Sequence, residues 1–156
     1  MFVVKKFQKL DSQGLILLLK EQFKETRASH LEKRVIACIK AVEEAKASTL
    51  LIAVSSDGFI IGYILIQWLH ELCADSPEAF ISSLFVHEEW RLKGVGSSLL
   101  KAAAQEAQKR NCARLFLENN RNNPIYHENF YSKRGWKEKE NISVFEYPQI
   151  RNFKAL

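Results

Sequence analysis

Cysteine is scarce in this chain, which has only Cys38, Cys73 and Cys112 among its 156 residues. Three widely separated cysteines suit neither a disulfide framework nor a zinc site. Long hydrophobic runs are also missing, since the run at 15–19 is far shorter than the roughly 20 apolar residues that span a bilayer. The start of the chain, Met1–Lys6, lacks the layout of a signal peptide. We therefore expect a cytoplasmic protein with no metal site and no membrane partner.

A strong charge excess of one sign is missing too: 23 Lys and Arg face 18 Asp and Glu, for a net charge of +5. That balance is compatible with a phosphate-bearing ligand, a membrane surface or nucleic acid. The basic residues are interspersed with acidic ones, as in Lys137–Glu140, which is typical of a solvated surface. A nucleic-acid interface would need a continuous basic face. We therefore keep a nucleic-acid partner only as the weaker alternative.

The length and a hydrophobic content of 47% predict one domain over residues 1–156 with a single core. No repeat, linker or low-complexity tract interrupts it. Hydrophobic periodicity predicts a mixed α/β chain, with hairpins before the middle and a β-α-β unit after it. We expect strands at 2–7, 50–54, 59–66, 79–86, 114–118, 136–140 and 142–147, and helices at 11–26, 31–46, 94–110 and 124–133.

Glycine is uncommon, with six in the chain, yet Gly94 and Gly96 stand one residue apart where an amphipathic helix pattern begins. Glycine inside a helix costs roughly 1 kcal/mol relative to alanine, so the pair needs a reason. The first amides of a helix have no intrahelical partner, and glycine lets the backbone approach a phosphate closely. Arg91 and Lys93 add positive charge, and the Ser97 hydroxyl can donate a hydrogen bond. The pattern predicts a pyrophosphate site.

Two common phosphate-binding motifs do not fit this turn. The P-loop motif Gly-x-x-x-x-Gly-Lys-Ser/Thr does not occur in the sequence. The dinucleotide fingerprint Gly-x-Gly-x-x-Gly needs a third glycine where Leu99 stands, and it usually opens a fold on its first strand. What remains is Arg-x-x-Gly-x-Gly after an apolar strand that ends with Leu84–Val86.

This block, from Ile81 to Leu100, resembles the GNAT superfamily of acyl-coenzyme A N-acyltransferases. A second block strengthens the resemblance. Glu118, Asn123 and the run 130–136, which reads Phe-Tyr-Ser-Lys-Arg-Gly-Trp, are similar to the family's Asn…Tyr-x-x-x-Gly-aromatic pattern. The resemblance covers residues 50–137. It implies the GNAT fold, an α/β architecture with a central, mostly antiparallel twisted sheet, splayed fourth and fifth strands, and helices on both faces.

The resemblance implies acetyl-coenzyme A (acetyl-CoA) as the acyl donor. Main-chain amides near the end of the strand at 79–86 would pair with the pantetheine arm, because the splay leaves that strand edge unpaired. The turn amides and Arg91 would hold the pyrophosphate, and family members often have glycine where Leu92 stands. The cofactor-binding residues implied in this way are Phe85, Val86, Arg91, Leu92, Lys93, Gly94, Val95, Gly96, Ser97, Asn123 and Tyr131.

The resemblance also implies direct attack of an amine on the thioester within a ternary complex. Tyr131 matches the family tyrosine that protonates the leaving thiolate as general acid, whereas Tyr126 lacks the following Gly-aromatic pair. The gap from Asn123 to Tyr131 is one residue longer than the commonest family spacing. The asparagines of the loop at 119–122 therefore remain alternatives for binding pantetheine.

The sequence leaves the general base open. Many relatives carry a carboxylate on the fourth strand, where this chain has Ser82 and Ser83. Glu118, near the expected splay, is our first candidate. The alternatives are a relay through ordered water or another side chain, namely Glu71, His70 or His127.

The acceptor is expected to be a primary amine of a small molecule or a protein. The polar segment 70–78 is the candidate loop over its site, and its carboxylates would either attract a cationic amine or simply be solvated. Family members are often dimers, so a homodimer stays open. The rival function is a catalytically silent CoA-binding module, which would need the Arg91, Gly94 and Gly96 turn but not Tyr131.

Overall fold

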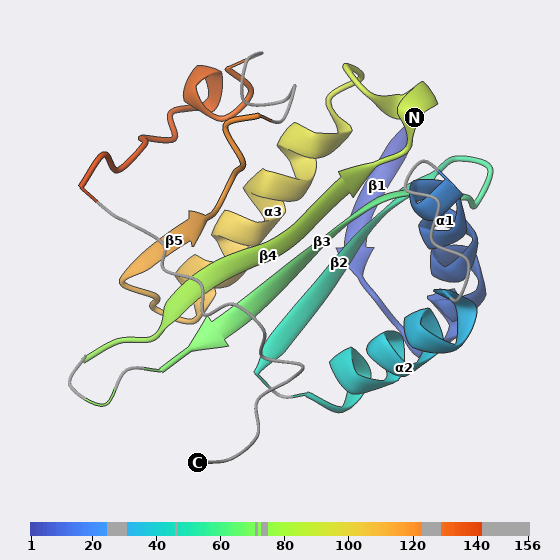
Figure 1. The fold of residues 1–156 in the computed structure, drawn as a ribbon, viewed down its shortest axis with the longest axis horizontal. Coiled ribbons are helices and arrows are strands. Elements are labelled where there is room, and N and C mark those ends of the chain that lie inside the picture. The colour runs from blue at the N-terminus through green and yellow to red at the C-terminus, as the bar shows by residue number, and fades with distance from the viewer. Residues whose placement is uncertain (25–30, 46, 71, 73–74, 123–128, 142–156) are drawn as a thin grey trace. The chain divides into compact units, whose positions relative to one another are not determined.

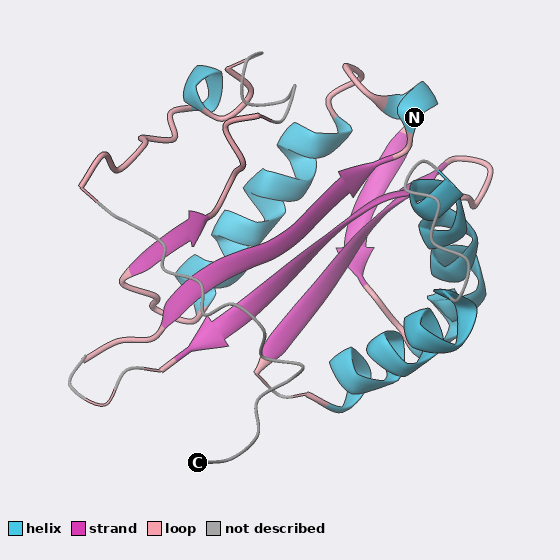
Figure 2. Cartoon of the chain, in the orientation of Figure 1, coloured by secondary structure: helices cyan, strands magenta, loops and turns pink. Residues whose placement is uncertain are grey.

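A computed structural model describes the chain except for residues 25–30, 46, 71, 73–74, 123–128 and 142–156. It divides into two compact units, residues 1–118 and 119–156, and each is described here by itself. The first unit holds nearly all of the regular structure (Figures 1 and 2). Its elements are β1 (Phe2–Lys6), η1 (Lys9–Asp11), α1 (Ser12–Lys24), α2 (Leu31–Glu44), β2 (Ser48–Ser55), β3 (Ile60–Leu69), β4 (Glu78–Val86), η2 (Glu88–Trp90), α3 (Val95–Lys109) and β5 (Arg114–Leu117).

The five strands form one sheet in the order β1-β2-β3-β4-β5. The first three pairs are antiparallel, and β4 and β5 are parallel because the α3 crossover joins them. The β2–β3 hairpin turns at Gly58, whose φ of +85° favours glycine. The expected fold class, a mixed and mostly antiparallel sheet, is confirmed.

Helices cover both faces of the sheet, with α1 and α2 on one face and α3 on the other (Figure 1). On α3 the residues spaced by one helical turn are buried: Val95, Leu99, Ala103 and Ala107. That stripe packs so closely on β3 that a Cβ added to Gly62 would lie 3.3 Å from the side chains of Leu99 and Val95. The amphipathic pattern therefore predicted this helix correctly.

The α1 and α2 face has its own apolar core. Leu15 and Leu18 of α1 and Ile39 of α2 are buried against Leu50 and Ile52 of β2. Apolar side chains therefore pack on both faces of the sheet, in two layers and not in the single core expected from the sequence.

The structure differs from part of what the sequence predicts for residues 119–156. The expected strand at 136–140 is wrong, because residues 136–139 have no regular structure and a turn follows. After Trp136 this stretch has only charged side chains, too few apolar residues to define a buried strand face. Of the helix expected at 124–133, the described residues contain only the short 3-10 turn η3 (Ser132–Arg134). The strand expected at 142–147 lies outside the described residues.

Candidate functional site

The carboxyl half of β4 has an open edge in the described part of the chain. Strand β5 pairs with β4 only from Glu78 to Ile81, although β4 continues to Val86. The other edge of β4 stays paired to β3 throughout, apart from a register shift that leaves Ser82 as an extra residue. An open strand edge offers unpaired main-chain groups to an extended ligand.

The register decides which groups point to that edge. The His87 N–H donates to the Ile61 carbonyl across the β3–β4 pair, at 2.9 Å. Main-chain groups of an antiparallel strand alternate in direction. The N–H and C=O of Phe85 therefore also point toward β3, while those of Leu84 and Val86 point toward the open edge. Phe85 points its ring toward the α1 and α2 core, where it lies 6.3 Å from the Tyr63 ring. The sequence named Phe85 and Val86, and on this register Leu84 joins Val86 at the open edge.

The turn between β4 and α3 has the backbone shape of an anion site. Gly94 precedes the helix with a φ of +84°, and the space where its Cβ would stand has no atom within 4 Å. The first helical bond in this turn runs from the Ser98 N–H to the Gly94 carbonyl, at 3.0 Å. The amides of Val95 and Gly96 therefore have no intrahelical acceptor, and the helix dipole adds partial positive charge at the same point.

Leu92 is the unexpected residue in this turn. Its φ is +61°, a left-handed conformation that favours glycine, and its side chain is fully exposed, at 100%. The conformation explains in physical terms why glycine suits this position. In this chain leucine takes it at a cost in backbone strain.

Two cations are held beside the turn. Arg91 Nε donates to the Val86 carbonyl at 3.1 Å, and the guanidinium carbon lies 5.8 Å from the centre of the Phe85 ring. Lys93 Nζ lies 5.3 Å from the centre of the Trp90 ring. These contacts keep positive charge close to the open amides, where it would add to the attraction for a phosphate.

Tyr131 stands in an aromatic cluster of the second unit. Its ring makes edge contacts with the Phe130 and Trp136 rings, with centroids 5.1 and 6.0 Å away. Gly135 turns the chain with a φ of +81°, and the Trp136 N–H then donates to the Tyr131 carbonyl at 3.3 Å. Burial raises the pKa of the Tyr131 phenol, so the group stays protonated at neutral pH and can act as a proton donor.

The family model for the GNAT acetyltransferases matches residues 13–136. The protein belongs to the GNAT acetyltransferase family. The match spans most of the chain and includes both the β4–α3 turn and the Tyr131 cluster. No curated protein matches the chain significantly.

Solved GNAT acetyltransferases share the fold. AAC(6')-Iy, in complex with the bisubstrate analogue CoA-S-monomethyl-acetylneamine, aligns with a TM-score of 0.79 at 20% identity, over 94% of this chain and 98% of its own. Glucosamine-6-phosphate N-acetyltransferase from Arabidopsis thaliana aligns at 0.74 and 15%, over 94% and 98%. Ribosomal-protein-alanine N-acetyltransferase from Brucella melitensis aligns at 0.72 and 18%, over 94% and 99%. At these identities the likeness shows the fold alone.

One contact of this GNAT domain was not expected from the sequence. His87 Nε2 lies 3.3 Å from a Glu21 carboxylate oxygen, and its Nδ1 accepts from the Glu89 N–H at 3.3 Å. Because the Glu21 carboxylate accepts from Nε2 and the Glu89 N–H donates to Nδ1, these contacts favour the tautomer with the proton on Nε2. The imidazole therefore ties α1 to the segment that leads into the turn. Glu21 and His87 are 66 residues apart, so no local pattern could have paired them.

The remaining site predictions are placed as follows. Glu118 is exposed, one residue beyond β5, and His70 is exposed beyond β3. Asn123, Tyr126, His127 and Glu71 lie outside the described residues. Asn119, one of the alternative asparagines, has a buried Nδ2 with no hydrogen-bond partner among the described residues.

The described residues contain no cluster of three or more His, Cys, Asp or Glu that could hold a metal ion. None of the helices they form is both long enough and apolar enough to span a bilayer.

Proposed function

We propose that the protein is an N-acetyltransferase that moves an acetyl group from acetyl-CoA to a primary amine. The observation that carries the proposal is the route of β4. Among the residues that the structure describes, the strand has no β5 partner after Ile81, continues unpaired on that edge to Val86, and leads through the Arg91–Ser97 turn into α3. An open strand edge followed by an amide-lined turn suits an extended arm that ends in a pyrophosphate.

The residues present fit such a ligand. The space beside Gly94 has room for a phosphate oxygen close to the backbone, since no atom lies where a Cβ would stand. In the proposed complex, the N–H of Val86 and the main chain of Leu84 pair with the pantetheine arm. The amides from Leu92 to Ser97, together with Arg91 and Lys93, hold the pyrophosphate.

The proposed chemistry is a direct transfer. The amine nitrogen attacks the thioester carbonyl carbon, a C–N bond forms and the C–S bond breaks, and Tyr131 gives its phenolic proton to the departing sulfur. The raised pKa of Tyr131 supports this role, because a phenol that stays protonated can donate. The proton that the amine loses goes to a base, for which Glu118 remains our candidate, directly or through water.

We further propose that the two units act as one domain, since the GNAT match crosses the boundary between residues 118 and 119. The names of the similar structures include a sugar phosphate and a ribosomal protein as acetyl acceptors. These acceptors differ so widely that we propose no acceptor narrower than a primary amine of a small molecule or protein. A cytoplasmic location and a homodimer stay predictions.

The test is a panel of amines incubated with acetyl-CoA and the protein, with release of free thiol as the readout. The proposal expects turnover of at least one amine, and a Tyr131→Phe variant that binds CoA normally but transfers slowly. CoA binding without turnover of any amine would instead support a silent CoA-binding module. A Tyr131→Phe variant with the native rate would refute the acid role.

A further inference from the structure

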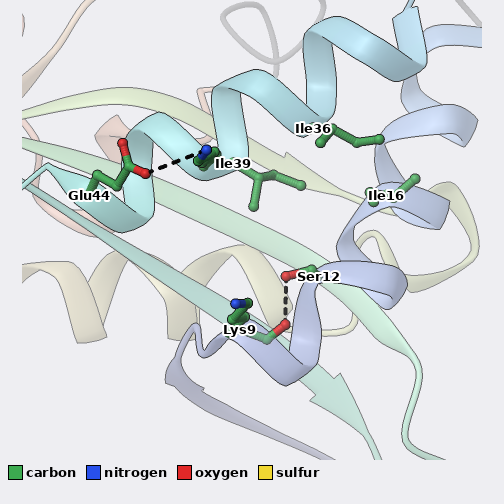
Figure 3. A pocket seen from close by; sticks show the side chains of 7 residues that line it. Lys9, Ser12, Ile16, Ile36, Ile39 and Glu44 are labelled. Atoms are coloured by element: carbon green, nitrogen blue, oxygen red, sulfur yellow. Dashed lines mark hydrogen bonds and ion pairs between the residues drawn. The ribbon is translucent and has the colours of Figure 1, made fainter.

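A pocket lies between α1 and α2, on the face of the sheet opposite α3. It has a volume of about 300 Å³ and is lined by residues of η1, α1 and α2. None of them belongs to β4 or to the β4–α3 turn. The lining residues are Lys9, Ser12, Ile16, Ile36, Ile39, Lys40 and Glu44 (Figure 3).

The middle of the pocket is apolar. Ile16 comes from α1, and Ile36 and Ile39 come from α2, so the two helices face each other across isoleucine side chains (Figure 3). Ile39 is buried in the core, but Ile36 is 48% exposed. An isoleucine left half open at a hollow offers apolar surface that a ligand can remove from water.

The rim of the pocket is polar and carries more positive than negative charge. Among the described residues, Lys9 has no ion-pair partner. The Ser12 hydroxyl donates to the Lys9 carbonyl at 2.6 Å. Lys40 and Glu44 are both well exposed and stand 4.0 Å apart, the limit for an ion pair. The lining therefore holds two lysines and one glutamate, which favours a ligand with a single negative charge.

We infer that this pocket binds a small amphipathic carboxylate, such as octanoate, separately from the acetyl-transfer site. The chain of the ligand lies against Ile16, Ile36 and Ile39, and its carboxylate meets the ammonium groups of Lys9 and Lys40. A volume of about 300 Å³ is at the small end for ligand sites, which suits a short aliphatic chain.

The aliphatic chain and the carboxylate of the ligand contribute unequally to its affinity. Each methylene group moved from water into the pocket tightens binding about fourfold, until the pocket is full. An ion pair at an exposed rim contributes little, so reversal of the Lys9 charge weakens binding only about fivefold. The apolar wall therefore supplies most of the affinity, and the lysines select the charged head.

The test is calorimetric titration of the full-length protein with butanoate, hexanoate and octanoate, without acetyl-CoA. The inference expects affinity to rise about fourfold per methylene, octan-1-ol to bind more weakly than octanoate, and Ile36→Ser to lower the affinity about tenfold. The matched control is Leu17→Ser, which changes a leucine on α1 that is 53% exposed and outside the lining. It should leave the affinity unchanged. Lys9→Glu should weaken binding about fivefold, whereas the control Lys101→Glu on α3 should have no effect.

Three results would overturn the inference. They are no saturable octanoate binding to the wild-type protein, equal affinity across the chain-length series, and an equal loss in Leu17→Ser and Ile36→Ser. Octan-1-ol binding as tightly as octanoate would also contradict the inference, because the lysines would then not select a carboxylate. Because the titration needs no acetyl transfer, its outcome is independent of the proposed enzymatic function.

Discussion

Replacing Leu92 by glycine should stabilise the protein, which is unusual for a glycine substitution. A leucine in the left-handed region costs about 1–2 kcal/mol, and Leu92 has a φ of +61° with a fully exposed side chain that buries nothing in return. Glycine removes that cost but adds about 0.5–1 kcal/mol of backbone entropy to the unfolded chain. The net gain in free energy of unfolding should be about 0.5–1 kcal/mol.

Urea denaturation of the wild-type protein and Leu92→Gly measures this gain, and thermal melting should show a rise in Tm of about 1–4 °C. The control is Leu10→Gly, at another exposed leucine, in η1, where φ is not positive. That variant should lose about 0.5–1 kcal/mol, because it adds the entropy cost without relieving strain. CoA affinity of Leu92→Gly should not fall, since the turn amides are retained. Equal destabilisation by both substitutions would refute the argument from strain.

Three further predictions concern other parts of the chain. Burial alone would raise the pKa of Glu106, but hydrogen bonds and charge from Lys6 and Lys109 outweigh it and lower the pKa. Glu106→Gln should therefore cost about 1–3 kcal/mol at neutral pH, and in urea titrations this difference should vanish as the pH falls through the lowered pKa. Gly62→Ala should cost about 1–3 kcal/mol in the same assay, since its Cβ would stand 2.9 Å from the Phe85 carbonyl oxygen. Because burial raises the pKa of Tyr131 above its usual value of about 10, the transfer rate should decline only beyond that pH, and Tyr131→Phe should lack this decline.

The parts of the fold that follow from local periodicity could be read from the sequence. Helix α3 is an example, because its buried residues recur once per turn and its start is marked by glycine. The same holds for the β2–β3 hairpin, where Gly58 supplies the positive φ that the turn needs. Both depend on residues close together in the chain, which is why their patterns were sufficient.

Features that depend on pairing between distant residues could not be read in this way. The direction of the main-chain groups of Leu84 and Phe85 follows from the register of β4 on β3, and that register includes the extra residue Ser82. The contact between Glu21 and His87 follows from the packing of α1 beside the end of β4. No local pattern encodes either of them.

The β4–α3 turn could be predicted from the sequence only in part. The glycine pair correctly marked the start of α3, but the left-handed conformation of Leu92 contradicts the ordinary preference of leucine. It is expected only where the surrounding structure imposes it, as at a functional turn.

The central claim is that the amides around Gly94 bind the pyrophosphate of CoA, and calorimetric titration with CoA tests it most directly. The design compares Gly94→Val with Gly58→Val. Both glycines have a φ close to +85° and no atom within 4 Å of the missing Cβ, so the backbone strain of the two variants should match. We predict saturable heat for the wild-type protein and Gly58→Val, and its loss in Gly94→Val. Absence of binding to the folded wild-type protein, or equal affinity in both variants, would contradict the claim.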